Sequence, residues 1–194
     1  MSDFLASKPG RLALVALCLL GLVPWHTPPS AVGSESLAYR LLGPIASLAA
    51  SAQWVRYDLA LRDGNYELAY ARAETALALD RGASEGWTTL AGHLIFDRGT
   101  LNAAGSPEGR RRWIQSGLDL IDQGAPLVRD PEALEFLRGT VYAHLALQPE
   151  EDLGWPGGSR AALLSAAAAF DRSAALGHPE AAGYADNMRD LAAK

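Results

Sequence analysis

The sequence predicts an all-α protein, and three observations lead to this fold class. Apolar residues make up 49% of the 194-residue chain but aromatic residues only 8%, so much of the apolar content is alanine and leucine, which are strong helix formers. After residue 55 no stretch alternates apolar and polar residues over more than a few positions, as a half-buried strand would. Small residues also recur at helical spacing in "GNYELAYARAETALALDRGASEGWTTLAG", residues 64–92.

The N-terminus has the pattern of an export signal or a membrane anchor. Lys8, Arg11 and the free amine precede the uncharged run "LALVALCLLGLV" at residues 12–23. The positive end is expected to stay in the cytoplasm, which places the rest of the chain on the other side of the membrane. We expect an uncleaved signal anchor that crosses a bacterial inner membrane once through residues 12–25. The alternative is a signal peptide that is cleaved near Gly33 and releases the domain into the periplasm.

Composition divides the chain into the anchor segment 1–26, a linker and juxtamembrane segment 27–43, and a helical domain 44–194. The first core helix is expected to begin near Pro44, because proline is favoured in the first helical turn. Apolar residues of this helix follow helical spacing and are expected to face the core: Ile45, Leu48, Ala52, Val55 and Leu59.

Residues 54–90 are expected to pack through small residues and aromatic side chains. Alanines four and three residues apart lie on one helical face, and their small size lets two helix axes approach closely. Aromatic side chains would fill the remaining space between helices, and each helix pair would leave an apolar face for the next pair to cover. The residues assigned to this packing are Trp54, Tyr57, Gly64, Tyr66, Ala69, Ala73, Ala76, Trp87 and Leu90.

In order and spacing these residues resemble a tetratricopeptide repeat (TPR), a unit of two antiparallel helices. The match covers residues 64–94 and includes the turn glycine Gly64, the aromatic Tyr66 that follows it, and Trp87 with Leu90 in the next helix. The resemblance implies a short TPR-like right-handed superhelix of about three helix pairs plus a capping helix. The whole chain is also similar to bacterial membrane-anchored repeat proteins. This resemblance implies an architecture and no activity.

Helix-pair ends recur at Asp80, Asp130 and Pro179, and the later units are longer than the first because turn-rich insertions separate their helices. Seven helices are expected, at 44–62, 66–79, 84–97, 107–123, 131–146, 159–175 and 179–193.

The two insertions, at residues 99–109 and 149–158, are the first place to seek partner contacts. Insertions at corresponding places in a repeat array collect on one rim, where they can provide specificity. The inner, concave surface of the array is the other candidate for binding a peptide or helix. Trp155 lies in a glycine-rich loop, where it either packs on its own helices or is presented to a partner. The candidate partner-binding residues are Leu101, Asn102, Arg110, Arg111, Trp113, Leu153 and Trp155.

His93 and Asp97 are four residues apart on one expected helix, the spacing of two metal ligands or of an acid–base pair. A metal site needs a third ligand, and no HExxH motif or cysteine pair accompanies them. A partly buried polar pair inside the helical stack is therefore the simpler interpretation. No motif of nucleophilic catalysis is present, so we expect no catalytic residue, no metal and no cofactor. The net charge of −5 disfavours binding to nucleic acid.

These patterns indicate a non-enzymatic scaffold or adaptor that mediates protein–protein interactions in a bacterial cell-envelope complex. One alternative is an accessory subunit whose N-terminal helix packs within a larger integral membrane assembly. The other is a metal-dependent enzyme or factor that uses His93 and Asp97.

Overall fold

The computed structural model describes residues 43–148 and 155–194, and these residues form an all-helical domain without strands. This part of the chain therefore confirms the predicted fold class. None of its helices combines the length and the apolar character needed to cross a membrane. The predicted anchor and all of the linker except its last residue lie outside the described residues. The helices are α4 (Pro44–Arg62), α5 (Tyr66–Leu79), α6 (Ser84–Gly92), the π-helical turn η1 (His93–Arg98), α7 (Leu101–Ala104), α8 (Pro107–Gly124), α9 (Pro131–Ala146), α11 (Gly158–Ala175) and α12 (Ala181–Ala192).

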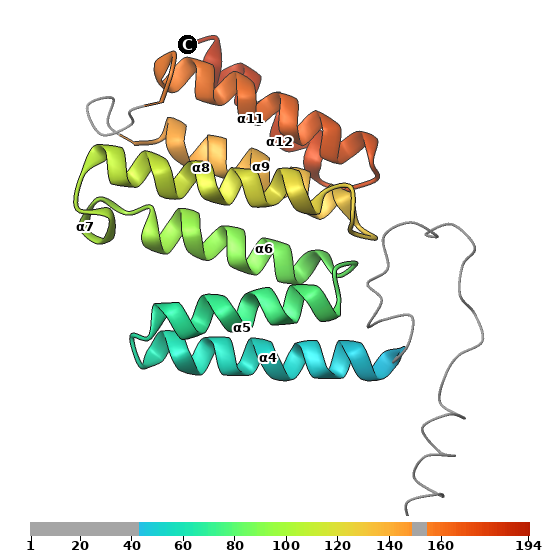
Figure 1. Cartoon of the computed structure of the whole chain (residues 1–194). Helices are drawn as coiled ribbons and strands as arrows, with labels where there is room; N and C mark the ends of the chain where they lie inside the picture. Colours follow the sequence, from blue (N-terminus) through green and yellow to red (C-terminus); the bar gives the residue numbers. More distant parts are fainter. Residues whose placement is uncertain (1–42, 149–154) are drawn as a thin grey trace, which may run out of the picture.

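The helices pack in sequential pairs, as Figure 1 shows. α4 packs on α5, α6 and η1 pack on α8, and α9 packs on α11, which also contacts α12. The α4–α5 pair lies at one end of the stack and α11 with α12 at the other. Two elements differ from the expected helices: α6 continues into the π-helical η1, and the short α7 occupies the first insertion.

Small residues bring α4 and α5 together. Ala69, Ala73 and Ala76 of α5 are at most 1% exposed, as expected for a face on which two helix axes approach closely. Gly64 joins the two helices with φ of +71°, a conformation that residues with a Cβ rarely adopt.

Larger side chains fill the remaining space between α4, α5 and α6. Tyr57, Trp87 and Leu90 are buried. The half-buried Trp54 covers Gly86, where a Cβ would lie only 2.9 Å from the Trp54 ring. The absence of a side chain at position 86 therefore sets how closely α4 and α6 approach.

Two packing predictions are wrong. Tyr66 is 41% exposed rather than buried between helices, because it lies at the first turn of α5, where its ring contacts His93 and Arg98 of η1 but stays open to solvent. The predicted core face of α4 is also reversed. The helix buries Ala46, Ala50, Tyr57 and Ala60, and it exposes Ile45, Leu48, Ala52, Val55 and Leu59. As the first described helix of the stack, α4 has an extensive contact with α5 alone, and the alanine face permits the closer approach.

A buried carboxylate connects three parts of the stack. Asp80, at the end of α5, is 8% exposed. It accepts a hydrogen bond from Ser47 Oγ of α4 (2.7 Å) and pairs with the guanidinium of Arg129, between α8 and α9 (3.6 Å). Because a buried charge is tolerated when it is paired, this contact helps to fix α4, the end of α5 and the segment between α8 and α9 relative to one another.

Candidate functional site

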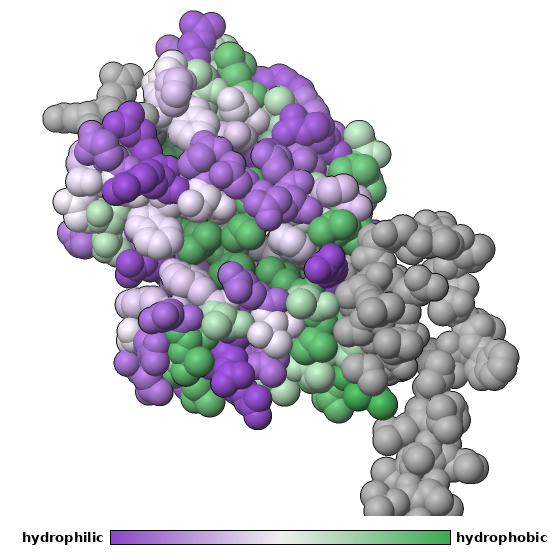
Figure 2. All heavy atoms as spheres, in the orientation of Figure 1, coloured by the Kyte–Doolittle hydropathy of each residue, from purple (hydrophilic) through white to green (hydrophobic). Residues whose placement is uncertain are grey.

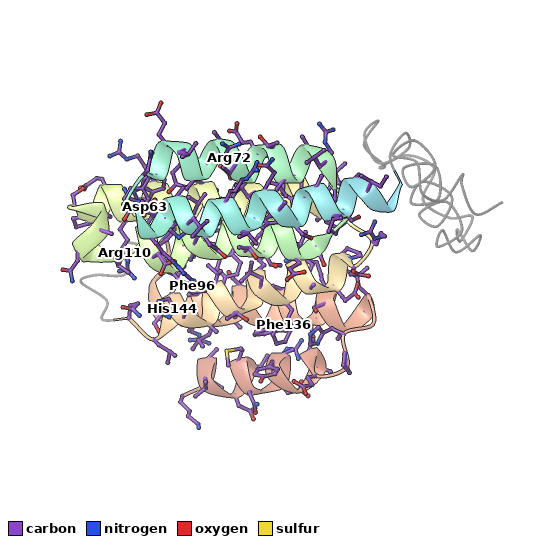
Figure 3. All side chains as sticks on the ribbon, turned by 90° about the horizontal axis from the view of Figure 1, so that it is seen from below. Asp63, Arg72, Phe96, Arg110, Phe136 and His144 are labelled. Atoms are coloured by element: carbon purple, nitrogen blue, oxygen red, sulfur yellow. The ribbon has the colours of Figure 1, made fainter. Side chains whose placement is uncertain are left out.

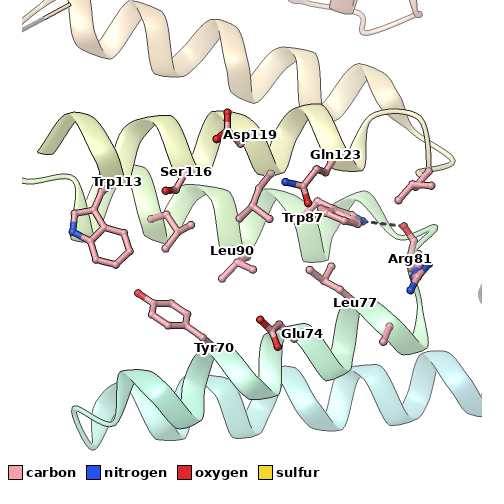
Figure 4. A pocket seen from close by; sticks show the side chains of 14 residues that line it. Tyr70, Glu74, Leu77, Arg81, Trp87, Leu90, Trp113, Ser116, Asp119 and Gln123 are labelled. Atoms are coloured by element: carbon pink, nitrogen blue, oxygen red, sulfur yellow. Dashed lines mark hydrogen bonds between the residues drawn. The ribbon is translucent and has the colours of Figure 1, made fainter. Parts of the chain in front are cut away.

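An open groove with a volume of about 910 Å³ lies between α5 and α8. We call it the α5–α8 groove. Its floor is apolar and comes mainly from Trp87, Leu90 and Leu94, while Leu77 of α5 and Leu120 of α8 extend the apolar surface up the walls. Figure 4 shows α5 and α8 on its two sides with α6 behind. Apolar atoms over α6, bordered by polar ones, are visible at this place in Figure 2.

The length of the groove suits a helical segment. Its α8 wall runs from Trp113 to Gln123, which at 1.5 Å per residue is about 15 Å, or nearly three helical turns. The indole N–H of Trp87 donates to the carbonyl oxygen of Arg81 (2.9 Å), as the dashed line in Figure 4 shows. This bond restrains the Trp87 ring within the floor of the groove.

Polar side chains line both walls above the apolar floor. Glu74 lies on α5 and Asp119 on α8, and both are exposed. Asp119 also accepts a hydrogen bond from the Gln115 amide (2.8 Å). The middle of the groove therefore carries one negative charge on each side. The only basic residue lining it is Arg81, at one end.

Two aromatic rings hold a cation close to the other end of the groove. The guanidinium carbon of Arg98 lies 4.5 Å from the ring centroid of Tyr66 and 5.0 Å from that of Trp113. Such contacts stabilise a cation over an aromatic face. Arg98 is the last residue of η1. Through its contacts with Tyr66 of α5 and Trp113 of α8, it connects these two helices.

The same turn brings His93 and Asp97 together, with His93 Nδ1 3.0 Å from Asp97 Oδ2. The side chain of His93 is 11% exposed and that of Asp97 70%. The rings of Tyr57, Tyr66 and Tyr70 surround the imidazole, with centroids 6.0, 6.5 and 6.1 Å away. Among the described residues, no group of three or more His, Cys, Asp or Glu could hold a metal ion.

This cluster contains buried polar atoms without a hydrogen-bond partner among the described residues. They are Tyr57 Oη, Tyr70 Oη, His93 Nε2 and Arg98 Nε. Burial raises the pKa of the Tyr57 hydroxyl, and the neighbouring Tyr70 raises it further. Burial also raises the pKa of Tyr70, which the positive Arg98 partly offsets. Both tyrosines are therefore neutral hydroxyls at physiological pH, and their rings pack beside the His93 ring at the contact between α4, α5 and η1.

The first insertion lies against the C-terminal end of α9, where the second insertion begins. A hollow of about 390 Å³ is lined by Gly99, Thr100 and Asn102 on one side and by His144 and Gln148 on the other. Phe96 and His144 make an edge-to-face contact, with centroids 5.3 Å apart. Figure 3 shows Phe96, Arg110 and His144 at the same end of the molecule.

Arg110 is a structural residue rather than an exposed partner contact. It is 5% exposed, and its Nε donates to the carbonyl oxygen of Gly99 (3.1 Å). Gly109 is buried beside it, and Ser106 Oγ caps α8 by accepting from the Gly109 amide (3.0 Å). The run "RRRW" is amphipathic: Arg111 and Arg112 are exposed, whereas Arg110 points inward to hold the insertion in place.

Burial lowers the pKa of His144 from its ordinary value of 6.5, and the positive charge of Arg110 lowers it further. His144 in the native state therefore binds a proton less readily than in the unfolded chain. Well above pH 6.5 it is neutral in both states and does not change the free energy of unfolding. As the pH falls below 6.5, the unfolded chain takes up the proton first and the native state is destabilised.

We expect His144→Gln to reduce the loss of thermal stability between about pH 7 and pH 5. Melting curves of both proteins across this range test it, and parallel curves would contradict it.

The other predicted partner residues are dispersed. Asn102 and Arg111 are exposed near α7, and Trp113 lines the α5–α8 groove. Trp155 packs on its own helices, with its ring centroid 5.4 Å from that of Tyr142 in α9. Leu153 lies outside the described residues, as does the side chain of Leu101.

Most residues of the groove were not predicted as a site. Leu77, Leu90 and Leu94 follow ordinary core spacing and are at most 9% exposed. The distance between α5 and α8 leaves only one edge of each side chain open to the groove. Glu74 and Asp119 are isolated acids in the sequence, 45 residues apart. Only the packing of α5 and α8 on either side of α6 brings these two acids to the same groove.

Comparisons with protein-family models, with curated proteins and with solved structures found no significant match to this chain.

Proposed function

We propose that this chain is a protein-interaction module that binds an amphipathic helix of another protein in the α5–α8 groove. The observation that carries the proposal is the apolar floor of this groove, open over about three helical turns and flanked by Glu74 and Asp119. Recognition of a helix in a groove uses apolar anchors at helical spacing. A partner of matching chemistry presents apolar side chains to Trp87, Leu90 and Leu94 and basic side chains to the two acidic walls.

The wider setting of the proposal is a scaffold or adaptor of a bacterial cell-envelope complex. The uncharged run at 12–23 supports a membrane anchor with the helical domain on the periplasmic side. The order of the helix pairs and the TPR-like spacing at 64–94 support a short right-handed superhelix, a fold that exposes extended binding surfaces. In this proposal the chain holds partners together and catalyses no reaction.

The test begins with a displayed library of random helical peptides, selected on the full-length chain in lipid nanodiscs. We expect the selected peptides to combine apolar residues at i, i+3 and i+4 spacing with Lys or Arg beside them. Their affinity for the chain is then measured by fluorescence polarisation with synthetic labelled peptides.

Charge reversal on the groove walls provides the decisive comparison. Glu74→Lys with Asp119→Lys should weaken the selected peptides by about tenfold or more, since like charges then face each other across the interface. Glu180→Lys with Asp190→Lys is the matched control. It changes the net charge by the same amount, at exposed positions at the start of α12 and within it. Equal losses in both variants, or selected peptides without basic residues, would refute the proposed groove function.

A further inference from the structure

The first described helix, α4, presents an apolar stripe to solvent. Its large members are strongly exposed: Leu48 by 72%, Val55 by 59%, Leu59 by 52% and Ile45 by 50%. Ala52, between them, is exposed as well. We call these five residues the α4 stripe. Apolar atoms are visible along the lower edge of Figure 2, where α4 lies.

The stripe faces away from the rest of the domain. The buried residues of α4 are Ala46, Ala50, Tyr57 and Ala60. At 100° per residue, the centre of the stripe lies about 140° around the helix from the centre of this buried face. The contact of α4 with α5 therefore cannot cover the stripe, and a rotation of the helix that buried it would expose Tyr57.

The spacing within the stripe is that of a coiled-coil seam. Positions 45, 48, 52, 55 and 59 follow a 3-4-3-4 order, which assigns them to a, d, a, d and a of a heptad repeat. The opposite end of the stack differs, because the outer side of α12 carries the exposed polar residues Asp186, Asn187 and Asp190. One end of the stack is thus closed by a polar helix, while the other presents a narrow seam suited to another helix.

We propose that the α4 stripe pairs with the α4 stripe of a second copy, with the two helices antiparallel. Flanking charges decide between the two possible directions. In a parallel pair, Asp58 at position g would face Asp63, the residue that caps the end of the other helix at position e, and this repulsion would occur twice. Like charges in direct contact destabilise a helix pair, so the parallel arrangement is disfavoured.

The antiparallel arrangement avoids this repulsion. Pairing Leu48 of one copy with Leu59 of the other also pairs Ala52 with Val55 around a two-fold axis, as a symmetric dimer requires. Ile45 then lies opposite Arg62 at the end of the seam. In this register Asp58 faces Ser51, and Arg56 faces an alanine. The sequence of one helix is thus compatible with itself in the reversed direction without a like-charge contact.

A hollow beside the stripe fits the same register. It has a volume of about 280 Å³ and is lined by Arg56, Leu59, Ala60, Asp63, Leu68 and Arg72. In Figure 3, which views the molecule from the side of α4, Asp63 and Arg72 mark this region. The antiparallel register brings Leu48 of the second copy against Leu59, at this hollow. Leu48 is the most exposed large residue of the stripe. In a coiled-coil seam, such a side chain inserts between neighbouring residues of the facing helix.

Disulfide cross-linking of the full chain in membranes tests the register. The only native cysteine, Cys18, is first replaced by serine. Leu48→Cys together with Leu59→Cys should give a covalent dimer on mild oxidation, because the two positions face each other across the seam. Each single variant should give no covalent dimer. Efficient cross-linking of either single variant would overturn the antiparallel register, and no cross-linking of the double variant would overturn the pairing.

Disruption of the seam tests the dimer independently of any cysteine. Leu48→Glu with Val55→Glu replaces exposed residues, so the domain should keep its helical circular dichroism while the molecular mass in detergent, measured by light scattering, falls from dimer to monomer. Leu176→Glu with Leu191→Glu is the matched control, since both leucines are also exposed, and it should remain dimeric. A monomeric wild-type chain, or equal loss of the dimer in both variants, would overturn the proposal.

Discussion

Phe170→Ala is expected to lower the free energy of unfolding by about 3–5 kcal/mol, the range for removing a fully buried aromatic ring. Phe170 is 2% exposed and lies at the centre of the core formed by α9, α11 and α12. Its ring centroid is 5.2 Å from that of Phe136 and 5.4 Å from that of Tyr184. At Gly139 a Cβ would come within 2.6 Å of the ring, so the helices are fitted to this side chain.

Urea unfolding of the full chain, followed by circular dichroism, measures this loss. Since domains of this size are stable by about 5–15 kcal/mol, the substitution should remove a large part of the total. Leu164→Ala on the same helix is the control, because Leu164 is 50% exposed and should change stability by only about 0.5 kcal/mol. Similar effects of the two substitutions would show that the ring does not hold the three helices together.

Gly117→Ala is expected to destabilise the protein by about 1–3 kcal/mol, although alanine is the better helix former. A Cβ at position 117 would lie 2.4 Å from Cγ1 of Ile95 and 3.0 Å from the carbonyl oxygen of Ala91. The Ile95 side chain could rotate away, but the backbone oxygen could move only with its helix. An added methyl group would therefore push α8 away from α6 and η1.

Gly183→Ala, the same substitution at another helical glycine, is expected to raise the stability of the protein. Gly183 lies in α12, and a Cβ there would meet nothing within 4 Å. This substitution should stabilise the protein by roughly 0.5–1 kcal/mol through helix propensity alone. Thermal melts of Gly117→Ala and Gly183→Ala measure the two changes in stability, and so separate the effect of helix propensity from that of close packing. A stabilising effect of Gly117→Ala would contradict the close contact between α8 and η1.

Local patterns predicted the helices well and their faces less reliably. Capping and turn residues such as Pro44, Gly64 and Asp130 mark helix ends through their own backbone preferences, so the ends of α4, α5 and α9 agree with expectation. The phase of α4 was wrong, because two faces of this helix follow apolar spacing. One contains large residues and the other mostly alanines, and hydrophobicity alone favours the larger set.

For the candidate sites too, contacts within one helix were predictable from the sequence, whereas contacts between distant segments were not. His93 and Asp97 were recognisable as a pair, since residues four apart on a helix are neighbours, and they are in contact at 3.0 Å. Arg110 was predicted as a partner contact because it belongs to a basic run, yet its Nε bonds to the Gly99 carbonyl. That difference depends on how the insertion folds back on α8, which neither the charge nor the spacing of the run specifies.

The sequence by itself determined the helices, their order and their turns, because these depend on propensities and caps acting over a few residues. Only the tertiary structure decided which face of each helix is covered and which surfaces remain open. The α5–α8 groove exists because α5 and α8 stand apart on either side of α6, and the α4 stripe is exposed because α4 has an extensive contact with α5 alone. Both surfaces result from the number and spacing of neighbouring helices, a property that no single helix encodes.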